Sequence, residues 1–367
     1  MNTEALRTVA ATYGTPTYIF DVREVEARIR LLRSLLPEDT GLCFAVKANP
    51  FLIPYVADLV DRLEVCSPGE YEICIQEQIA PEKIVVSGVN KTYESMKRIL
   101  SYSKGAGIYT IESEEHAKIL RTLAEKNQMP LSVLIRLSSG NQFGVDAETF
   151  LRLAKEIQES PYLTLAGVHY YAGTQKRQSK LEKELDTLTA FAKTFEEETG
   201  TVLNELEYGA GMKVSYFIND SEKDQRESEP EPQIQALAEK LRTCAYGKKT
   251  IELGRFLVSM SGYYLTRVMD VKRTAQPGFL ILDGGIHQIN YYGWMMGMKQ
   301  PEIEVLAEKD GDEELFHLCG SLCTVNDVLA RDVALHDPQK GDVICFKRCG
   351  AYAATEGMAM FLSRELP

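Results

Sequence analysis

The residues of this chain that could perform chemistry are a lysine, a glycine-rich turn and an acid–arginine pair, each near the end of an apolar run. Lys47 ends the run CFAVK, and a lysine in such a place either pairs with a carboxylate or forms an imine with a carbonyl compound. The turn from Gly209 to Gly211 follows ELEY and can hold a phosphate through its backbone amides. Glu252 and Arg255, in ELGR, come about forty residues later. An amine, a phosphate cradle and a carboxylate for a ring nitrogen are the groups that pyridoxal phosphate (PLP) requires.

These residues need a scaffold that brings the ends of separate apolar runs together. Over the first two-thirds of the chain, eight short apolar runs alternate with amphipathic stretches, which predicts eight strands separated by helices. That pattern favours a (β/α)8 barrel over a doubly wound sheet, because no GxGxxG motif opens the first helical stretch. Barrel active sites lie at the C-terminal ends of the strands, where Lys47, the glycine turn and Glu252 would meet. The runs are CFAVK (43–47), RLEVCS (62–67), KIVVSG (83–88), GIYTIES (107–113), LSVLIRL (131–137), LAGVHYYAG (165–173), LNELEYGAG (203–211) and TIELGRFLV (250–258).

The pattern changes after about residue 262, where strand-like runs are joined by turns with few helical stretches. Residues 22–262 are therefore expected to form the barrel, and residues 263–367 a β-rich domain built as a β-sandwich or β-barrel. The strand-like segment TPTYIFD precedes the barrel, so residues 1–21 are expected to join the β-rich domain. The acidic, proline-containing segment 219–233 has almost no apolar residues and is expected to be a solvated, mobile loop.

The composition argues against several classes of protein. The 367 residues are 44% hydrophobic and 26% charged, which is ordinary for a globular chain. A net charge of −12 without a basic stripe argues against nucleic-acid binding, and no apolar run is long enough to cross a membrane. The first residues lack the features of a secretory signal, so we expect a cytoplasmic location with eight reduced, mostly buried cysteines. The five histidines have no paired spacing, which predicts no metal site, and His116 and His336 are expected at the surface.

Six motifs in a fixed order carry a resemblance that covers most of the chain. The six motifs look like the motifs YAVKAN, DVVSGGE, HxHxGSQ, EPGR, GPxCxxxDxLxxD and SAGAY of one enzyme family. In the same order, they are FAVKANP, LEVCSPGE, VHYYAGTQ, ELGR, LCGSLCTVNDVLARD and CGAYAA. The chain resembles the fold-type III PLP-dependent decarboxylases, the family of diaminopimelate decarboxylase and eukaryotic-type ornithine decarboxylase. The resemblance implies the alanine racemase-like fold, a PLP-binding barrel with a C-terminal β-domain, and release of CO2 from an amino acid that is bound to the cofactor.

The resemblance also implies a role for each candidate residue. Lys47 would form the Schiff base with PLP, and Cys323, from the β-rich domain, would donate the proton that replaces the lost carboxylate. Glu252 would pair with the ring nitrogen, Tyr171 would cover the ring in place of the family's histidine, and His169 is either a core histidine or a contact of the cofactor. The other expected cofactor contacts are Arg136, Thr174, Gly209, Gly211, Gly254, Arg255 and Tyr352. The expected substrate contacts are Arg255, His287, Tyr291, Thr324, Asp327 and Tyr352.

The departures from the family concern the substrate. Diaminopimelate decarboxylases carry a glutamate directly after the catalytic cysteine and an arginine after the VDAGxN-like strand; these positions are Thr324 and Tyr291 here. Neither residue can neutralise the zwitterionic distal end of diaminopimelate, and a buried charge left unpaired costs several kcal/mol. The DGGIH segment and Tyr171 are similar to a subgroup that acts on aminoacyl thioesters of acyl-carrier proteins in secondary metabolism, for example a glutamyl unit. The substrate is therefore either such a carrier-bound amino acid or a free one, such as lysine, ornithine, diaminopimelate or glutamate.

Two other classes of protein stay open from the sequence. A PLP-dependent racemase shares the barrel, the lysine and the β-domain, but that family lacks the cysteine loop GSLCTVND. An inactive, regulatory homologue would be expected to have lost Lys47 or Cys323, and both are present. In the decarboxylase family the cysteine loop of one copy reaches into the barrel of another, so the resemblance implies a homodimer with two equivalent sites.

Overall fold

The computed structural model describes residues 1–103, 107–274, 276–291 and 297–363. The chain divides into two compact units: a barrel unit, Glu26–Lys213 with Glu227–Leu257, and a β-rich unit, Met1–Val25, Val214–Arg226 and Val258–Pro367. The predicted domain limits, 22–262 against 1–21 and 263–367, stay a prediction. Their parts at 104–106, 275, 292–296 and 364–367 lie outside the described residues.

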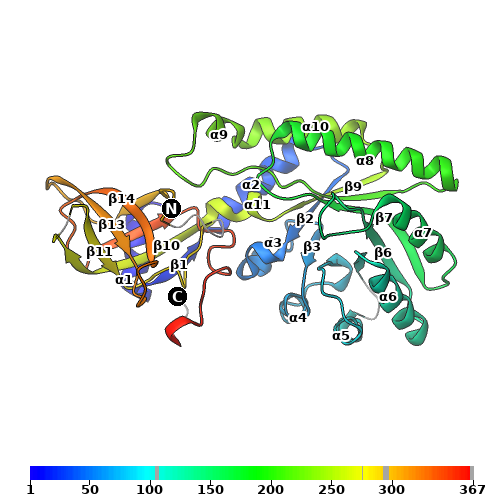
Figure 1. Ribbon diagram of the computed structural model, residues 1–367, viewed down its shortest axis with the longest axis horizontal. Coiled ribbons are helices and arrows are strands. Elements are labelled where there is room, and N and C mark those ends of the chain that lie inside the picture. The colour runs from blue at the N-terminus through cyan, green and yellow to red at the C-terminus, as the bar shows by residue number, and fades with distance from the viewer. Residues whose placement is uncertain (104–106, 275, 292–296, 364–367) are drawn as a thin grey trace. The chain divides into compact units, whose positions relative to one another are not determined.

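Eight parallel strands close into a barrel, which confirms the predicted (β/α)8 fold (Figure 1). The strands follow one another around the barrel in chain order, and the last pairs with the first, so that Gly41 of β2 lies opposite Thr250 of β9. A Cβ at Gly41 would come within 2.9 Å of the Thr250 hydroxyl, which explains the glycine at this closure. Each strand overlaps one of the predicted runs. The strands are β2 (Thr40–Ala45), β3 (Arg62–Val65), β4 (Ile84–Val86), β5 (Ile108–Ile111), β6 (Leu131–Arg136), β7 (Leu163–Tyr171), β8 (Glu205–Gly209) and β9 (Lys248–Leu253).

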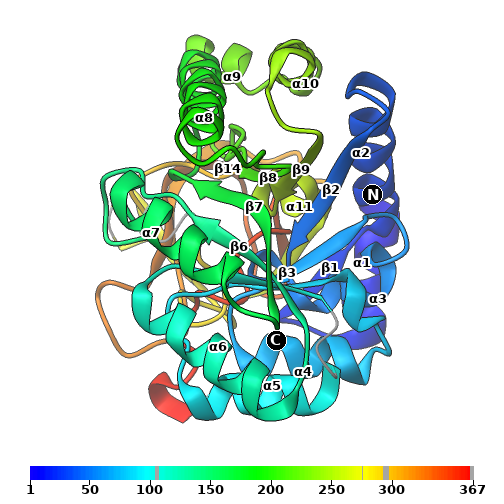
Figure 2. The ribbon, with the colours of Figure 1, turned by 90° about the vertical axis from the view of Figure 1, so that its right-hand side faces the viewer.

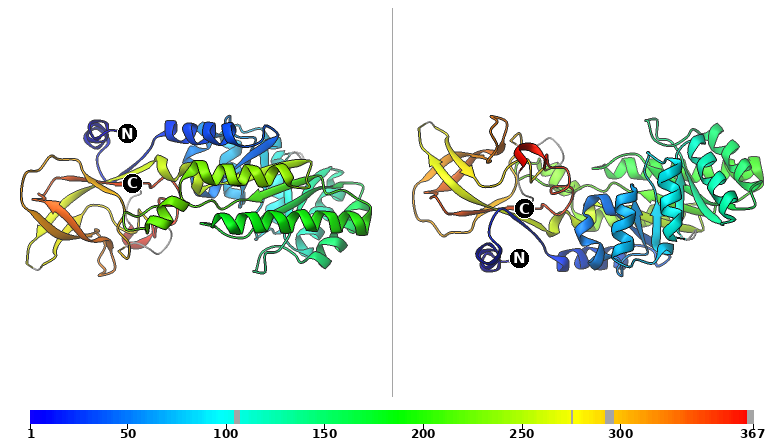
Figure 3. Two further views of the ribbon diagram at one scale, coloured as in Figure 1. Left: turned by 90° about the horizontal axis from the view of Figure 1, so that it is seen from above. Right: turned by 90° about the horizontal axis from the view of Figure 1, so that it is seen from below.

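Helices surround the barrel strands (Figure 2), and side-chain caps mark where several of them begin. The Ser67 side chain accepts a hydrogen bond from the Glu70 amide, and Asp146 accepts one from Thr149. Such caps satisfy amides that the first helical turn leaves without a partner. Two of the helices, α8 and α10, lie side by side (Figure 3). The helices of the barrel unit are α2 (Val22–Leu35), α3 (Ile53–Val56), α4 (Pro68–Gln76), α5 (Tyr93–Ser103), α6 (Glu114–Asn127), α7 (Ala147–Gln158), α8 (Gln178–Thr199), α10 (Pro230–Thr243) and α11 (Arg255–Val258), whereas α9 (Glu222–Glu227) belongs almost wholly to the β-rich unit.

The acidic segment 219–233 is partly helical, so the expectation of a mobile loop is wrong. The Ser221 hydroxyl accepts a hydrogen bond from the Asp224 amide in the first turn of α9. Pro230 begins α10, where the amide that proline lacks would have no helical partner. Gln233 is buried and its side chain bonds the backbone of Lys213 through both its oxygen and its nitrogen. The acidic composition therefore marks the solvated face of two helices.

The interior of the barrel holds apolar and charged side chains together. Arg62 is buried there and donates hydrogen bonds to Glu205 and Glu207, the latter at 2.9 Å from Oε2. Removing an arginine from water costs several kcal/mol, and the two carboxylates offset that cost only as long as both are in place. An apolar cluster inside the barrel is formed by Cys43, Val85, Ile108 and Leu134.

The β-rich unit contains a sheet of seven strands and confirms the prediction of a separate, mostly β domain. The sheet order is β12-β15-β10-β11-β13-β14, and β1 also pairs with β10. β10 changes partners along its length: residues up to Arg267 pair with β1 and β15, and residues from Val268 onward pair with β11. The elements are α1 (Thr3–Tyr13), β1 (Thr17–Phe20), β10 (Gly262–Lys272), β11 (Gly278–Leu282), β12 (Ile303–Val305), β13 (Glu313–Cys319), β14 (Val328–His336) and β15 (Val343–Lys347). Within the described ranges, no helix combines the length and the apolar character needed to cross a membrane.

Candidate active site

Lys47 lies just beyond the C-terminal end of the first barrel strand. β2 ends at Ala45, and a short 3-10 turn then carries the lysine. Its Nζ is 2.5 Å from Glu64 Oε2 and 3.5 Å from Glu252 Oε1. The two carboxylates come from β3 and β9, the strands that pair with β2 on either side, so closure of the barrel brings the three ends together. Both carboxylates are buried, whereas 34% of the Lys47 side chain is exposed. The two buried carboxylates therefore orient the Lys47 amine, while part of the lysine side chain stays accessible to a ligand.

Glu252 is the buried anion of the site. Its Oε2 lies 3.1 Å from Nε2 of His169, which is on β7 and also buried. Burial disfavours the charged carboxylate, but the Lys47 ammonium and the hydrogen bond with His169 lower the pKa of Glu252 to about 2. Glu252 is consequently ionised at neutral pH, and it can hold a proton on a nitrogen atom of a ligand.

A cavity of about 260 Å³ opens beside Lys47, and the residues that line it all belong to the barrel unit. This volume is close to the lower end of the range for small-molecule sites. The lining residues are Lys47, Glu64, Cys66, Ser87, Gly88, Val89, Asn90, Arg136, Phe143, His169, Tyr171 and Glu252. Four of the predicted cofactor contacts, Lys47, Arg136, Tyr171 and Glu252, are thus brought together. The other predicted contacts in the barrel unit, Thr174, Gly209, Gly211, Gly254 and Arg255, lie at or just after the C-terminal ends of β7, β8 and β9.

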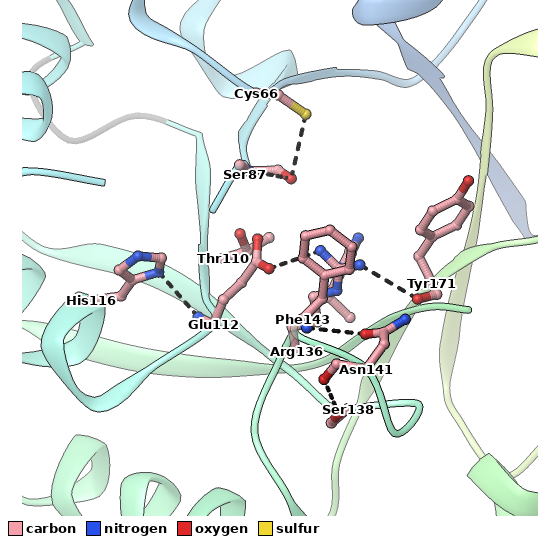
Figure 4. A network of polar contacts seen from close by, with 12 residues as sticks. Cys66, Ser87, Thr110, Glu112, His116, Arg136, Ser138, Asn141, Phe143 and Tyr171 are labelled. Carbon is pink, nitrogen blue, oxygen red and sulfur yellow. Dashed lines mark hydrogen bonds and ion pairs between the residues drawn. The ribbon is translucent and has the colours of Figure 1, made fainter. Parts of the chain in front are cut away.

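Arg136 forms one wall of the cavity (Figure 4). It donates from Nη1 to Glu112 Oε2 at 2.8 Å and from Nη2 to the Tyr171 carbonyl at 3.4 Å. The Phe143 ring covers its guanidinium at 4.8 Å. Gly144 turns the loop that carries Phe143: its φ is +74°, and a Cβ there would meet the Arg136 carbonyl at 2.7 Å. The Arg136 Nε is buried and has no hydrogen-bond partner among the described residues, so an acceptor atom of a ligand would relieve its desolvation cost.

The glycine turn after β8 is shaped by its neighbours on β7. A Cβ on Gly209 would come within 2.5 Å of the Tyr171 ring, so the aromatic side chain requires glycine at this position. Gly211 has φ +58°, and a Cβ there would lie 2.2 Å from the Gly173 carbonyl oxygen. Thr174 follows Gly173 in the same loop and is partly buried. The two backbone segments therefore approach each other more closely than side chains would allow.

The β-rich unit carries the predicted proton donor on a loop between β13 and β14. Cys323 is exposed, and Val325 beside it is 91% exposed. Asp327, at the base of the loop, is buried and accepts hydrogen bonds from the amides of Leu322, at 2.7 Å, and Ile286, at 2.8 Å. Asp327 thus holds the loop in shape and ties it to the turn that follows β11.

Three other predicted substrate contacts lie in the same unit. Tyr291 is buried, and its hydroxyl donates to the Lys347 carbonyl and lies 2.8 Å from Cys349 Sγ. His287 is also buried. Tyr352 has a left-handed backbone (φ +64°) and its carbonyl accepts hydrogen bonds from the two amides that close the next turn. The roles of these residues, of Thr324 and of Asp327 toward a substrate stay predictions, as do those of the cofactor contacts.

Glu64 and Cys66 belong to the cavity although they are absent from the predicted site residues. The Cys66 thiol donates to Glu64 Oε1 at 2.9 Å and lies 3.5 Å from Lys47 Nζ. Burial and the Glu64 carboxylate raise the pKa of this thiol far above its ordinary value, so the sulfur keeps its proton. Both residues lie at or just after the end of β3. The rule that polar residues at strand ends form the site, which selected Lys47, would have selected them too.

Three donors in the barrel have a spacing that suits a metal ion. Ligand atoms of His169, Glu207 and Glu252 lie within 4.8 Å of one another. Arg62 already bonds Glu207, and Lys47 already pairs with Glu252, so both carboxylates are neutralised without an ion. These pairs are a sufficient account of the cluster, and the expectation of no metal stays a prediction.

His116 is buried, so the expectation of a surface position is wrong. It lies in the first turn of α6, where Nδ1 accepts a hydrogen bond from the Glu112 amide (Figure 4). Burial and the Lys91 ammonium lower its pKa from 6.5 to about 4. The helical spacing of α6 places this residue, with Ala117 and Leu120, on the inner face of the helix.

The buried histidine makes stability depend on pH. The unfolded chain binds a proton at His116 more readily than the folded one, so stability is expected to fall as the pH decreases from 6.5 towards 4. After allowance for solvent screening, the loss between neutral pH and about pH 5 should be about 1 kcal/mol. Urea unfolding of the protein and of His116→Gln at both pH values measures it. An equal decrease in the two proteins would contradict this origin.

The residues at the mouth of the barrel fit PLP. An accessible amine, an ionised buried carboxylate and an arginine Nε without a partner in the described structure match the aldehyde, the ring nitrogen and an oxygen of the cofactor. A closed parallel barrel with these groups at its mouth defines a PLP-dependent barrel enzyme. Residues 22–259 match the family described as pyridoxal-dependent decarboxylase, pyridoxal binding domain. The chain belongs to this family and is a PLP-dependent amino-acid decarboxylase.

The similarity to known proteins extends over nearly the whole chain. A diaminopimelate decarboxylase of Actinosynnema pretiosum is 30% identical over 94% of this chain and 81% of its own length. The L-glutamyl-[BtrI acyl-carrier protein] decarboxylase of Niallia circulans is 26% identical over 100% of this chain and 91% of its own length. The lysine/ornithine decarboxylase of Vibrio vulnificus, solved with cadaverine, has the same fold: TM-score 0.86 at 19% identity, covering 99% of this chain and 95% of that one.

Proposed function

We propose that the chain removes the α-carboxyl group of an amino acid whose far end carries no charge pair, with a glutamyl-type aminoacyl group on an acyl-carrier protein as the leading candidate. When bound, PLP supplies the electron-accepting ring system that takes up the electron pair left at Cα as CO2 departs. In this proposal Lys47 binds the cofactor covalently and later releases the product. Glu252 is ionised and buried, so it can keep a proton on the ring nitrogen. Cys323 is proposed to protonate Cα.

The cysteine loop is the observation that carries the choice of substrate. Residues 320–327 include a single charged side chain, Asp327, and both of its carboxylate oxygens accept hydrogen bonds from backbone amides. Thr324 occupies the position next to the cysteine where diaminopimelate decarboxylases carry glutamate. A free distal ammonium or carboxylate would therefore lose its hydration without gaining a counter-charge from this loop. The relative from Niallia circulans, whose name specifies a carrier-bound glutamyl substrate, supports the same choice.

A second candidate is decarboxylation of free diaminopimelate. It is favoured by the relatives that bear this name, at 29% and 30% identity over about 95% of this chain. It would require a clamp for the distal end from residues other than Thr324, Tyr291 and Asp327.

A substrate panel decides between the candidates. The purified enzyme, loaded with PLP, is assayed for CO2 release from glutamyl-carrier protein, a glutamyl pantetheine thioester, free glutamate, ornithine, lysine and meso-diaminopimelate. We expect kcat/KM for the two thioesters to exceed that for every free amino acid by about 100-fold or more, as for a site that rejects an unpaired charge. Efficient turnover of free diaminopimelate would overturn the proposal.

We also propose that the functional unit is a homodimer with shared sites. The cavity is lined by residues of the barrel unit alone, while Cys323 and the apolar Val325 are exposed on the β-rich unit. An exposed apolar side chain beside an exposed thiol suits a loop that inserts into a second copy of the chain. The expected cytoplasmic location rests on the sequence and stays a prediction.

Mixing two inactive variants tests the shared site. Lys47→Ala and Cys323→Ala chains are each expected to be nearly inactive, but a mixed dimer would contain one site with both native residues. An equal mixture of the two variants, after subunit exchange, should have about a quarter of the native specific activity. Half of the dimers are then mixed, and half of the sites in these mixed dimers are intact. Activity that stays at the level of the separate variants would mean that each chain builds its own site.

A further inference from the structure

Lys176 is a buried lysine that none of the steps above uses. It lies in the loop between β7 and α8, and only 1% of its side chain is exposed. Its Nζ donates to Glu184 Oε2 at 2.7 Å and to the carbonyl oxygen of Gly209 at 3.0 Å. Its backbone amide donates to the carbonyl oxygen of Gly211 at 2.9 Å. One residue therefore binds the carbonyls at both ends of the glycine turn.

These two hydrogen bonds determine where the amides of the turn point. In a trans peptide the carbonyl of one residue and the N–H of the next point in opposite directions. The peptide bonds that follow Gly209 and Gly211 are both trans. With their carbonyls directed towards Lys176, the N–H groups of Ala210 and Met212 are directed away from it. The turn thus presents two amide donors on the side opposite the lysine.

The surroundings of Lys176 keep it in place. Tyr208 donates its hydroxyl hydrogen to Glu184 Oε2 at 2.7 Å, and its ring lies 4.9 Å from the Lys176 Nζ. Burial lowers the pKa of Lys176, and the Glu184 carboxylate opposes this effect. A Cβ on Gly211 would approach Lys176 Cε to 2.8 Å, so the glycine allows the aliphatic part of the lysine to pass directly behind the turn.

We propose that Lys176 is a positioning residue for the cofactor phosphate: it holds the glycine turn from behind, so that the amides of Ala210 and Met212 face the phosphate. The inference rests on the proposal that this turn binds the phosphate of PLP. In this inference Lys176 does not contact the cofactor itself, but it determines how tightly the glycine turn binds the phosphate group of the cofactor. Lys176 should therefore affect binding of PLP much more than binding of pyridoxal, which lacks the phosphate.

The experiment measures dissociation constants of the apoenzyme for PLP and for pyridoxal, from the absorbance change on binding. Lys176→Met should weaken PLP binding by about 10- to 100-fold, the worth of a charge-assisted hydrogen bond, and change pyridoxal binding less than about threefold. Because that variant leaves Glu184 buried without its partner, Lys176→Met/Glu184→Gln is measured beside it. Lys193→Met, on the exposed face of α8, is the matched control and should bind both ligands like the native protein.

The outcomes distinguish the role of Lys176 from the underlying proposal that the glycine turn binds the phosphate of PLP. If the native protein does not prefer PLP over pyridoxal, the assignment of the phosphate to this turn is wrong. If it does prefer PLP but the folded double variant keeps the full preference, Lys176 has no positioning role. Equal weakening for both ligands would likewise overturn the inference, since it would show general damage to the site.

Discussion

Replacing Lys47 by alanine is expected to abolish decarboxylation and the visible absorbance of the bound cofactor. No other amine forms an ion pair with Glu64 or Glu252 at the mouth of the barrel among the described residues, so no second amine is held in the position of Lys47. The expected loss of kcat is about 10³-fold or more, as for removal of a residue that forms a covalent bond in the reaction. Absorbance spectra and CO2 release, both after saturation with PLP, measure it.

Lys47→Arg is the matched variant. Arginine keeps a positive charge between the two buried carboxylates but cannot form the imine, so it separates the electrostatic from the covalent role of the lysine. We expect Lys47→Arg to be as inactive as Lys47→Ala but more stable, because alanine leaves two carboxylates without their cation. Turnover near the native rate in either variant would refute the covalent role.

Replacing Glu252 by glutamine should lower kcat by about 10²- to 10³-fold, the usual effect of removing a preorganised charge from a buried site. The native carboxylate is ionised and bonded by His169, and a neutral amide cannot hold a proton on the ring nitrogen. Glu64→Gln is the comparison, since Glu64 is equally buried and lies even closer to Lys47.

The two glutamine variants should differ sharply. Glu64 pairs with the lysine amine, a partnership that covalent attachment of the cofactor would end, so Glu64→Gln should lower kcat by about tenfold at most. Spectra of both variants should still show bound cofactor, which separates a defect in catalysis from a defect in binding. Equal losses of kcat would show that Glu252 acts only by orienting Lys47.

The barrel and the main groups at its mouth could be predicted because they follow from local rules. Eight apolar runs separated by amphipathic stretches define the strands, and the rule that polar residues at strand ends form the site selects Lys47 and Glu252. The pairing of Glu252 with His169 could not be predicted in this way, because the rule does not say which side chains of different strands face each other. It depends on the order and stagger of strands around the closed barrel.

Burial was the main property that the sequence could not reveal. His116 was expected at the surface but is buried, whereas segment 219–233 is mostly solvated as expected and differs in being helical, because an acidic run does not distinguish a loop from the outer face of a helix. The burial of Lys176 could not be predicted for a related reason. A lysine in a polar loop is expected at the surface, and its partner Glu184 follows eight residues later in the chain. Such pairs become visible only when the loop is folded back on the strand ends.

Asp327 has a consequence for how this enzyme could change over evolution. It holds the base of the cysteine loop through hydrogen bonds from the amides of Leu322 and Ile286. The side chains at the tip of the loop, Cys323 and Val325, are exposed to solvent. Residues at the tip can then be exchanged at small cost in folding energy. Related enzymes would then differ in substrate through one or two residues at the tip of the loop, while Asp327 is retained because it holds the loop in shape.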